Sequence, residues 1–156
     1  MTQTTSISHQ SLHLEMPVPG VGLAVVDQRG AAIRLSQRRM TFLVLLYLKR
    51  VSDEECAKQS ISVGWLPAKD TMDIQGLESL IWPSGAPYNS LYSLVHEVTS
   101  KFRAACGLDI VDHMRDVGYR LPQTLVISVS SDIVRWSRQR FGSLTPWQVH
   151  RAAAVS

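Results

Sequence analysis

The sequence predicts an α+β fold, and three observations support this prediction. Two β-prone runs, 23–26 and 31–35, flank the short segment 27–30, whose final glycine can take a positive φ, as expected for a β-hairpin. Three later segments carry apolar residues at helical spacing. Two further apolar runs within 110–121 enclose a turn-prone stretch at 116–118, which indicates a second β-ribbon.

The composition is that of a folded chain whose main domain carries no excess charge. Hydrophobic residues make up 45% of the 156 residues and charged residues 19%, which excludes a disordered chain. Residues 1–121 contain 12 basic and 12 acidic residues, so the net charge of +3 comes entirely from residues 122–156. A neutral domain is poorly suited to strong nonspecific binding of phosphates, which needs clustered Lys and Arg.

The remaining bulk features predict a cytoplasmic protein. Cys56 and Cys106 lie far apart without metal-ligand spacing, and we expect both to be reduced thiols. The chain lacks a run of about 18 apolar residues, and residues 1–17 have neither the basic start nor the apolar run of a secretory signal. We therefore expect no membrane span and no export signal. Residues 1–19 are polar, contain two prolines and are predicted to form a flexible arm.

The first helix is predicted to begin at residue 36. Ser36 can cap the open backbone N–H groups of the first turn, and apolar residues at most positions of 40–48 indicate a central, buried helix ending near residue 50. Arg38 and Arg39 lie in its first turn, where the helix dipole does not favour cations. Two interpretations stay open for this pair: a solvated helix start, or contacts with the phosphates of DNA.

A short second helix follows the irregular segment 51–72. Residues 73–82 place apolar side chains at helical spacing, with Asp73 as the predicted N-cap. The run Pro83-Ser84-Gly85 then ends the helix.

The third helix shows the clearest pattern of the chain. Within 90–106, apolar residues recur at i, i+3, i+4, i+7 and i+11 from Leu91, which predicts one buried stripe. Asn89 or Ser90 is the predicted cap, and Gly107 is the predicted left-handed stop. The face opposite the stripe carries polar and charged side chains: Ser93, His96, Glu97, Ser100, Lys101 and Arg103.

The segment 110–121, IVDHMRDVGYRL, follows this helix at once. Ile110 and Val111 begin a strand, 116–118 allows a turn or bulge, and 119–121 returns. Three helices followed by a ribbon is the winged helix-turn-helix arrangement. The sequence therefore predicts a winged-helix domain over residues 20–121, with a C-terminal extension at 122–156.

At these positions the chain resembles the DNA-binding domain of OmpR/PhoB-type response regulators. LSQRRMTFLVLLYL is similar to that family's LTPxEFxLLxxL opening of the first helix, and LESLIWP to its LLxxVWp second helix. SLYSLVHEVTSKF lies over its third, recognition helix, and VDHMRDVGYRL is similar to its VxTVRGxGYRL wing. The resemblance covers roughly residues 20 to 121, with no counterpart of the family's receiver domain.

The resemblance implies double-stranded DNA as the partner, with the third helix in the major groove and the wing in the minor groove. Arg115 matches the family's wing arginine, and Gly118 and Tyr119 match structural positions of the wing. With the charges and polar groups singled out above, the expected DNA contacts are Arg38, Arg39, Ser90, Ser93, His96, Glu97, Ser100, Lys101, Arg103 and Arg115.

Two departures from the family pattern concern charge. Glu97 stands where the recognition helix commonly has a base-reading arginine, and Asp116 follows the wing arginine in place of a glycine. A glutamate can accept a hydrogen bond from cytosine N4, but phosphates repel it. Two functions therefore stay open: a DNA-binding transcriptional regulator, or a winged-helix protein-interaction module that has lost strong DNA binding and acts as an adaptor, inhibitor or assembly subunit.

The C-terminal extension is expected to contain a strand and helices. TLVISVS alternates as a strand does, SDIVRWSRQRFG reads as a capped helix, and TPWQVHRAAA opens a second helix at Thr145. The extension packs on the domain, helps to hold DNA through its arginines, or forms a homodimer. The dimer contacts would be the aromatic side chains Trp136, Phe141 and Trp147.

The sequence does not predict an enzyme. The five histidines lack metal-ligand spacing, and nucleophile-elbow, P-loop and paired-carboxylate patterns are absent from the sequence. We therefore expect no catalytic residues, no metal and no cofactor.

Overall fold

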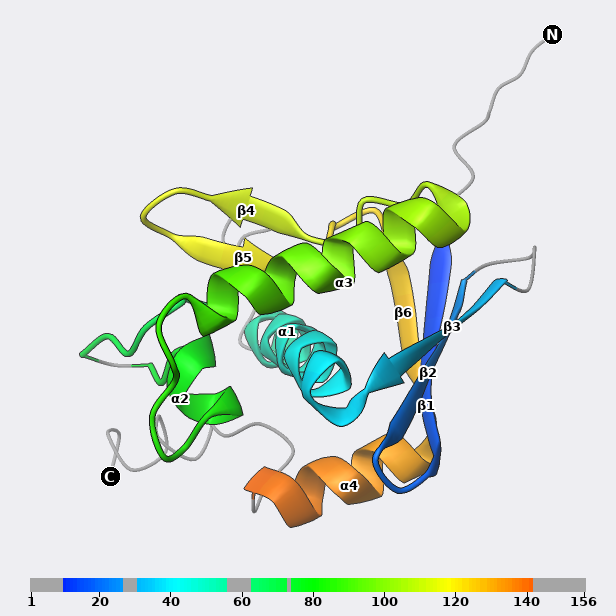
Figure 1. Cartoon of the computed structure of the whole chain (residues 1–156), viewed down its shortest axis with the longest axis horizontal. Coiled ribbons are helices and arrows are strands. Elements are labelled where there is room, and N and C mark those ends of the chain that lie inside the picture. The colour runs from blue at the N-terminus through cyan, green and yellow to red at the C-terminus, as the bar shows by residue number, and fades with distance from the viewer. Residues whose placement is uncertain (1–9, 27–30, 56–62, 73, 142–156) are drawn as a thin grey trace, which may run out of the picture.

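The computed structural model describes residues 10–26, 31–55, 63–72 and 74–141. These residues form a mixed α+β fold with a four-stranded sheet, a separate two-stranded hairpin and four helices (Figure 1). The elements in chain order are β1 (Ser11–Val18), β2 (Val21–Val26), β3 (Ala31–Ser36), α1 (Gln37–Glu55), α2 (Leu77–Ile81), α3 (Ser90–Cys106), β4 (Asp112–Met114), β5 (Gly118–Arg120), β6 (Val126–Val129) and α4 (Ser131–Phe141).

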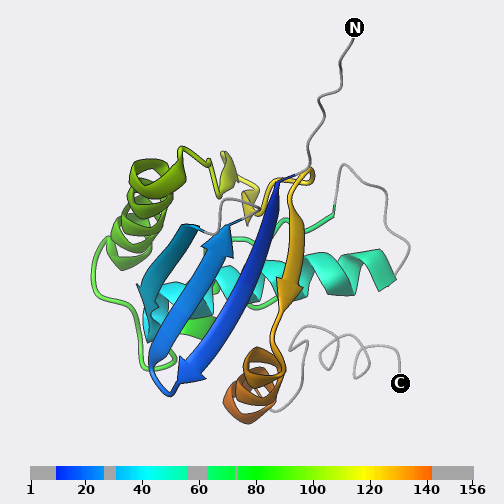
Figure 2. The ribbon, with the colours of Figure 1, turned by 90° about the vertical axis from the view of Figure 1, so that its right-hand side faces the viewer.

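Strand β1 lies inside the four-stranded sheet, whose order is β3-β2-β1-β6 (Figure 2). It pairs antiparallel with β2 and parallel with β6. The predicted flexible arm is therefore wrong for residues 11–18. Leu12, Leu14 and Met16 are buried and alternate with partly exposed residues, which is the period-two pattern of a strand. Pro17 lies where the β1–β2 register shifts, a position that does not require its missing N–H.

The predicted first hairpin is confirmed in its strands. β2 and β3 pair antiparallel from Val21 opposite Ser36 to Val26 opposite Ala31. The connecting segment 27–30 lies outside the described residues.

Helix α1 is the central element of the core, as predicted. Residues 40–46 are all buried, and Figure 2 shows α1 crossing one face of the sheet. The Arg39 N–H donates to the Ser36 hydroxyl at 3.4 Å, consistent with the predicted cap. The helix continues to Glu55, beyond the predicted end near residue 50.

A buried ion pair accounts for this longer helix. Lys49 Nζ donates to Asp53 Oδ1 at 2.6 Å, and the two side chains are 4% and 1% exposed. The other carboxylate oxygen of Asp53 accepts the Gly64 N–H at 2.9 Å. Asp53 therefore connects the last turns of α1 to the backbone at Gly64.

Helix α2 is shorter than predicted, and Asp73 lies outside the described residues. The carboxylate of Asp70 accepts from the Ser79 hydroxyl at 2.5 Å and from the Gly76 N–H at 2.8 Å. Both hydrogen bonds lower the pKa of Asp70, and the bond from Ser79 has the larger effect. These bonds hold the chain just before Leu77, where the helix begins.

Helix α3 confirms the predicted apolar stripe. Leu91, Leu94, Val98 and Phe102 are its buried residues. Gly107 adopts φ 73° and its N–H donates to the Arg103 carbonyl at 3.0 Å, as expected for a left-handed stop. The predicted side-chain cap does not form: Asn89 itself is left-handed, with φ 60° and no side-chain cap hydrogen bond.

The β4–β5 hairpin packs on the chain between α1 and α2. Tyr119 and Leu66 exchange backbone hydrogen bonds of 2.9 and 3.0 Å, so Leu66 forms a single antiparallel β-bridge with β5. Gly118 adopts φ 143°, and a Cβ at this position would clash with the Leu66 carbonyl group. The predicted structural role of Gly118 is thus explained by close backbone approach as well as by bending.

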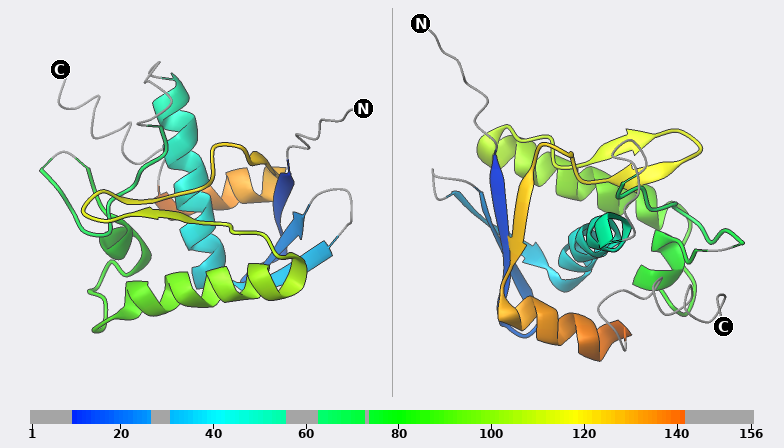
Figure 3. Two further views of the ribbon diagram at one scale, coloured as in Figure 1. Left: turned by 90° about the horizontal axis from the view of Figure 1, so that it is seen from above. Right: turned by 180° about the vertical axis from the view of Figure 1, so that it is seen from behind.

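The described part of the C-terminal extension packs on the domain. β6 joins the sheet beside β1, and Ile133 of α4 is buried in the core. Trp136 and Phe141 pack against that core and against each other, with ring centroids 6.1 Å apart. Trp147 and the predicted helix at Thr145 lie outside the described residues. Figures 1 and 3 show α4 at the end of the molecule opposite to α3 and the hairpin.

Within the part of the chain that the structure describes, no helix has the length and apolar character needed to cross a membrane.

Candidate nucleic-acid interface

The outer face of α3 is open to solvent. Ser93, His96, Glu97 and Ser100 are all exposed on the side opposite the buried stripe. Among the described elements, α1, β3 and the hairpin flank this helix, and α4 lies far from it (Figures 1 and 3). The four side chains can therefore meet a large partner together.

Ser90 differs from this group. It is half-buried, and its hydroxyl donates to the Pro87 carbonyl at 2.7 Å. The hydroxyl proton is therefore used in a local bond that closes the turn before α3, and only the acceptor lone pairs remain for the predicted base contact.

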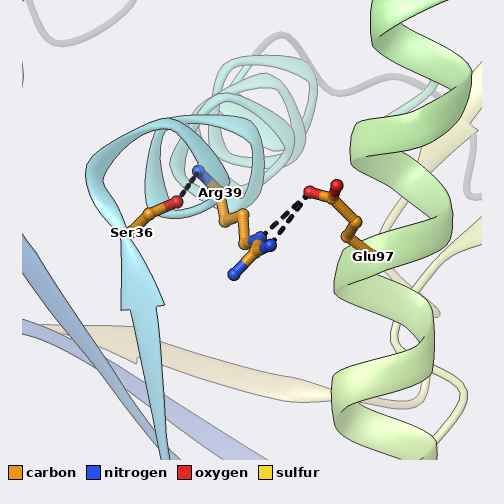
Figure 4. Close-up of polar contacts among 3 residues, drawn as sticks. All are labelled: Ser36, Arg39 and Glu97. Atoms are coloured by element: carbon orange, nitrogen blue, oxygen red, sulfur yellow. Dashed lines mark hydrogen bonds and ion pairs between the residues drawn. The ribbon is translucent and has the colours of Figure 1, made fainter.

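Arg39 and Glu97 join the start of α1 to the middle of α3 (Figure 4). Arg39 Nε and Nη2 both donate to Oε1 of Glu97, at 3.2 and 3.0 Å. The Arg39 side chain is 27% exposed and that of Glu97 is 49% exposed. The acidic residue on α3 is therefore locally neutralised by one of the arginines expected to bind phosphate.

The other expected cations are spread around α3. Arg38 lies over the Trp82 ring, 5.4 Å from its centroid, at the end of α2. Arg103 pairs with Asp109 at 2.7 Å, but both side chains are more than 60% exposed, so salt and a competing phosphate can break the pair. Lys101 is half-buried on the flank of α3.

Arg115 lies at the tip of the hairpin. It is exposed, and it makes no ion pair with any residue in the described segments. The turn is closed by the Val117 N–H, which donates to the Met114 carbonyl at 3.0 Å, and by Asp116 in the left-handed region at φ 67°. This turn carries Arg115, and Figure 1 shows the tip of the hairpin reaching outward beside α3.

A hollow of about 250 Å³ separates α3 from the hairpin. His113 of β4 stacks on Tyr119 of β5, with 4.5 Å between the ring centroids. Burial is the main cause that raises the pKa of Tyr119, and the nearby Tyr92 is the second. The hollow is lined by Tyr92, Val95, His96, Thr99, Arg103, Val111, His113 and Tyr119.

Two exposed tyrosines were not predicted as part of the site. Tyr88 is 94% exposed and Tyr92 is 72% exposed, just before and within the first turns of α3. The position of Tyr92 immediately after Leu91 places it off the apolar stripe, and this spacing could have identified it.

The described residues contain no cluster of three or more His, Cys, Asp or Glu side chains arranged to hold a metal ion. The candidate site consists of the exposed polar face of α3 and the hairpin turn that carries exposed Arg115. Comparison of the chain with protein-family models, with curated proteins and with solved structures finds no match.

Proposed function

We propose that the protein binds duplex DNA as a winged helix-turn-helix regulator. In this proposal α2 and α3 form the helix-turn-helix and the β4–β5 hairpin is the wing. One observation carries it: α3 and the hairpin lie side by side (Figures 1 and 3), and His96 of the exposed α3 face lines the same hollow as His113 of the hairpin.

The chemistry of this surface fits the grooves of B-DNA. An α-helix fits the major groove, where Ser93, His96 and Ser100 can donate to or accept from base edges. A projecting arginine such as Arg115 suits a narrow minor groove, whose negative potential attracts it. Arg103 can move from exposed Asp109 to a phosphate at small cost.

The charge distribution implies modest affinity. Raising the salt from about 50 to about 200 mM would lower the affinity for DNA about 10-fold if the protein makes two phosphate contacts. With five contacts the same change would lower it about 500-fold. Because Arg39 is paired with Glu97, we expect the loss of affinity with salt to be well below that of five contacts.

We propose that a homodimer forms on DNA, since helix-turn-helix proteins gain affinity by binding two half-sites about 10–11 base pairs apart. Trp136 and Phe141 already pack against the protein's own core. Both side chains stay only half-buried there, so Trp136 and Phe141 remain the proposed dimer contact together with Trp147, which lies outside the described residues.

Gel-shift titrations against genomic fragments at low and high salt test the proposal. The wild type is expected to retard fragments at about 50 mM salt, and Arg115→Ala to bind more weakly with a salt slope shallower by about 0.9. Arg138→Ala, which removes an exposed arginine of α4, is the matched control and should bind like the wild type. Absence of retardation for every fragment at low salt would refute the proposal.

A protein partner is the second candidate, and the exposed Tyr88 and Tyr92 favour it because tyrosine is enriched in protein interfaces. Under this alternative, Tyr92→Ala abolishes the capture of a co-purifying protein and the wild type retards no DNA.

A further inference from the structure

Arg39 binds only one of the two carboxylate oxygens of Glu97. Both Arg39 donors, Nε and Nη2, meet the same oxygen, Oε1. Oε2 has no hydrogen bond to any described residue, and Figure 4 shows it directed away from the guanidinium. The side chain is 49% exposed, so this second oxygen is available to a partner.

A carboxylate oxygen only accepts hydrogen bonds, and this restricts what it can recognise. In the major groove the amino donors are N4 of cytosine and N6 of adenine, whereas guanine and thymine present acceptors. Adenine also presents its N7 acceptor beside the amino group, which repels a carboxylate. Cytosine is therefore the base whose edge best matches Glu97.

We propose that Glu97 is a specificity-determining residue that accepts a hydrogen bond from N4 of one cytosine in the major groove. Arg39 is its positioning residue. The inference rests on the proposed DNA-binding function and names one base that the same surface reads.

Arg39 performs two tasks in this arrangement. Its two donors to Oε1 restrict the rotamers of Glu97 and fix the direction of Oε2. Its positive charge also offsets the repulsion between a carboxylate and the nearby phosphates. An ion pair that served stability alone would contribute little, because both side chains are partly exposed.

Selection of bound duplexes from a random-sequence pool, followed by sequencing, tests the inference. The wild type is expected to select a site with one C·G position preferred about 5-fold to 100-fold over other pairs. Glu97→Gln should move that position to A·T, because an amide pairs with N6 and N7 of adenine. Glu97→Ala should lose the preference without gaining a new one.

The role of Arg39 is tested in the same selection. Arg39→Met should weaken the cytosine preference at that one position, and Arg39→Lys should restore part of it. A merely structural role would instead change melting temperature or lower affinity evenly across all positions. Asp109→Asn, which breaks the other exposed arginine–carboxylate pair beside α3, is the matched control and should leave the position unchanged.

The two proposals fail in different ways. If the wild type retains no duplex from the pool at low salt, DNA binding itself is refuted and the cytosine contact with it. If the wild type and Glu97→Gln enrich the same site, the cytosine contact alone is refuted and DNA binding stands.

Discussion

Replacing Gly118 with alanine is expected to destabilise the protein strongly, because the hairpin and the segment around Leu66 approach closely at this residue. Gly118 adopts φ 143°, a region that L residues rarely occupy, and such strain is worth about 1–3 kcal/mol. The added Cβ would also lie 2.7 Å from the Leu66 carbonyl carbon and 2.8 Å from Pro67 Cα. These are backbone atoms, so no side-chain rotation relieves the clash.

The size of the destabilisation follows from the contacts that are lost when β5 and Leu66 move apart. Moving β5 away from Leu66 weakens the two backbone hydrogen bonds between Leu66 and Tyr119, each worth about 0.5–1.5 kcal/mol. With the strain, the expected loss in the free energy of unfolding is about 4 kcal/mol. At about 2–4 °C per kcal/mol for a domain of this size, the melting temperature should fall by about 8–16 °C.

Gly107→Ala is the matched control. Gly107 also has a positive φ, 73°, but a Cβ there would meet nothing within 4 Å. Only the conformational cost of an alanine in the left-handed region remains, about 1–2 kcal/mol. Urea unfolding of both variants and the wild type isolates the close contact, and a Gly118→Ala loss no larger than that of Gly107→Ala would refute the proposed packing of the hairpin.

Three further predictions concern ionisable groups. Asp53→Ala should lower the free energy of unfolding by about 3–5 kcal/mol because it removes the buried carboxylate that pairs with Lys49 and accepts the Gly64 N–H. Glu54→Ala, at an exposed position, should change urea unfolding little, and equal effects would contradict the buried pair. Burial raises the pKa of Tyr119, so its stabilising contribution is complete below about pH 10 and is lost as the pH rises through the raised pKa. The free energy of unfolding of Tyr119→Phe should therefore fall less at alkaline pH than that of the wild type, and an equal fall would count against this. Hydrogen bonds lower the pKa of Asp70, so its contribution is present above about pH 4 and is lost as the pH falls through the lowered value; the stability difference between wild type and Asp70→Asn should be largest near pH 7 and shrink in acid, and a difference independent of pH would exclude this linkage.

Helix α3 and the hairpins could be predicted because local sequence determines them. The stripe that begins at Leu91 and the stop at Gly107 are periodic or conformational signals within one segment. Strand β1 carries an equally local signal, with Leu12, Leu14 and Met16 in alternation, but the neighbouring prolines suggested an arm. A proline at a register shift is compatible with a strand, and sequence alone does not reveal where the register shifts.

The candidate site was predictable in most of its members, Tyr88 and Tyr92 excepted, but not in its contacts. The α3 face and Arg115 follow from helical spacing and from the position of a turn. The pairing of Arg39 with Glu97 joins residues 58 positions apart, and only the packing of α1 against α3 determines it. Ser90 likewise has a hydroxyl suited to a base contact, but the geometry of the preceding turn directs it to Pro87.

Backbone amide NMR mapping of the protein titrated with a selected duplex tests the central claim most directly. Chemical-shift changes are expected to concentrate at Ser93, Ser100 and Arg115, with Arg135 and Arg138 of α4 unaffected. Changes confined to α4, or absent from both α3 and the hairpin tip while the duplex is bound, would contradict the account.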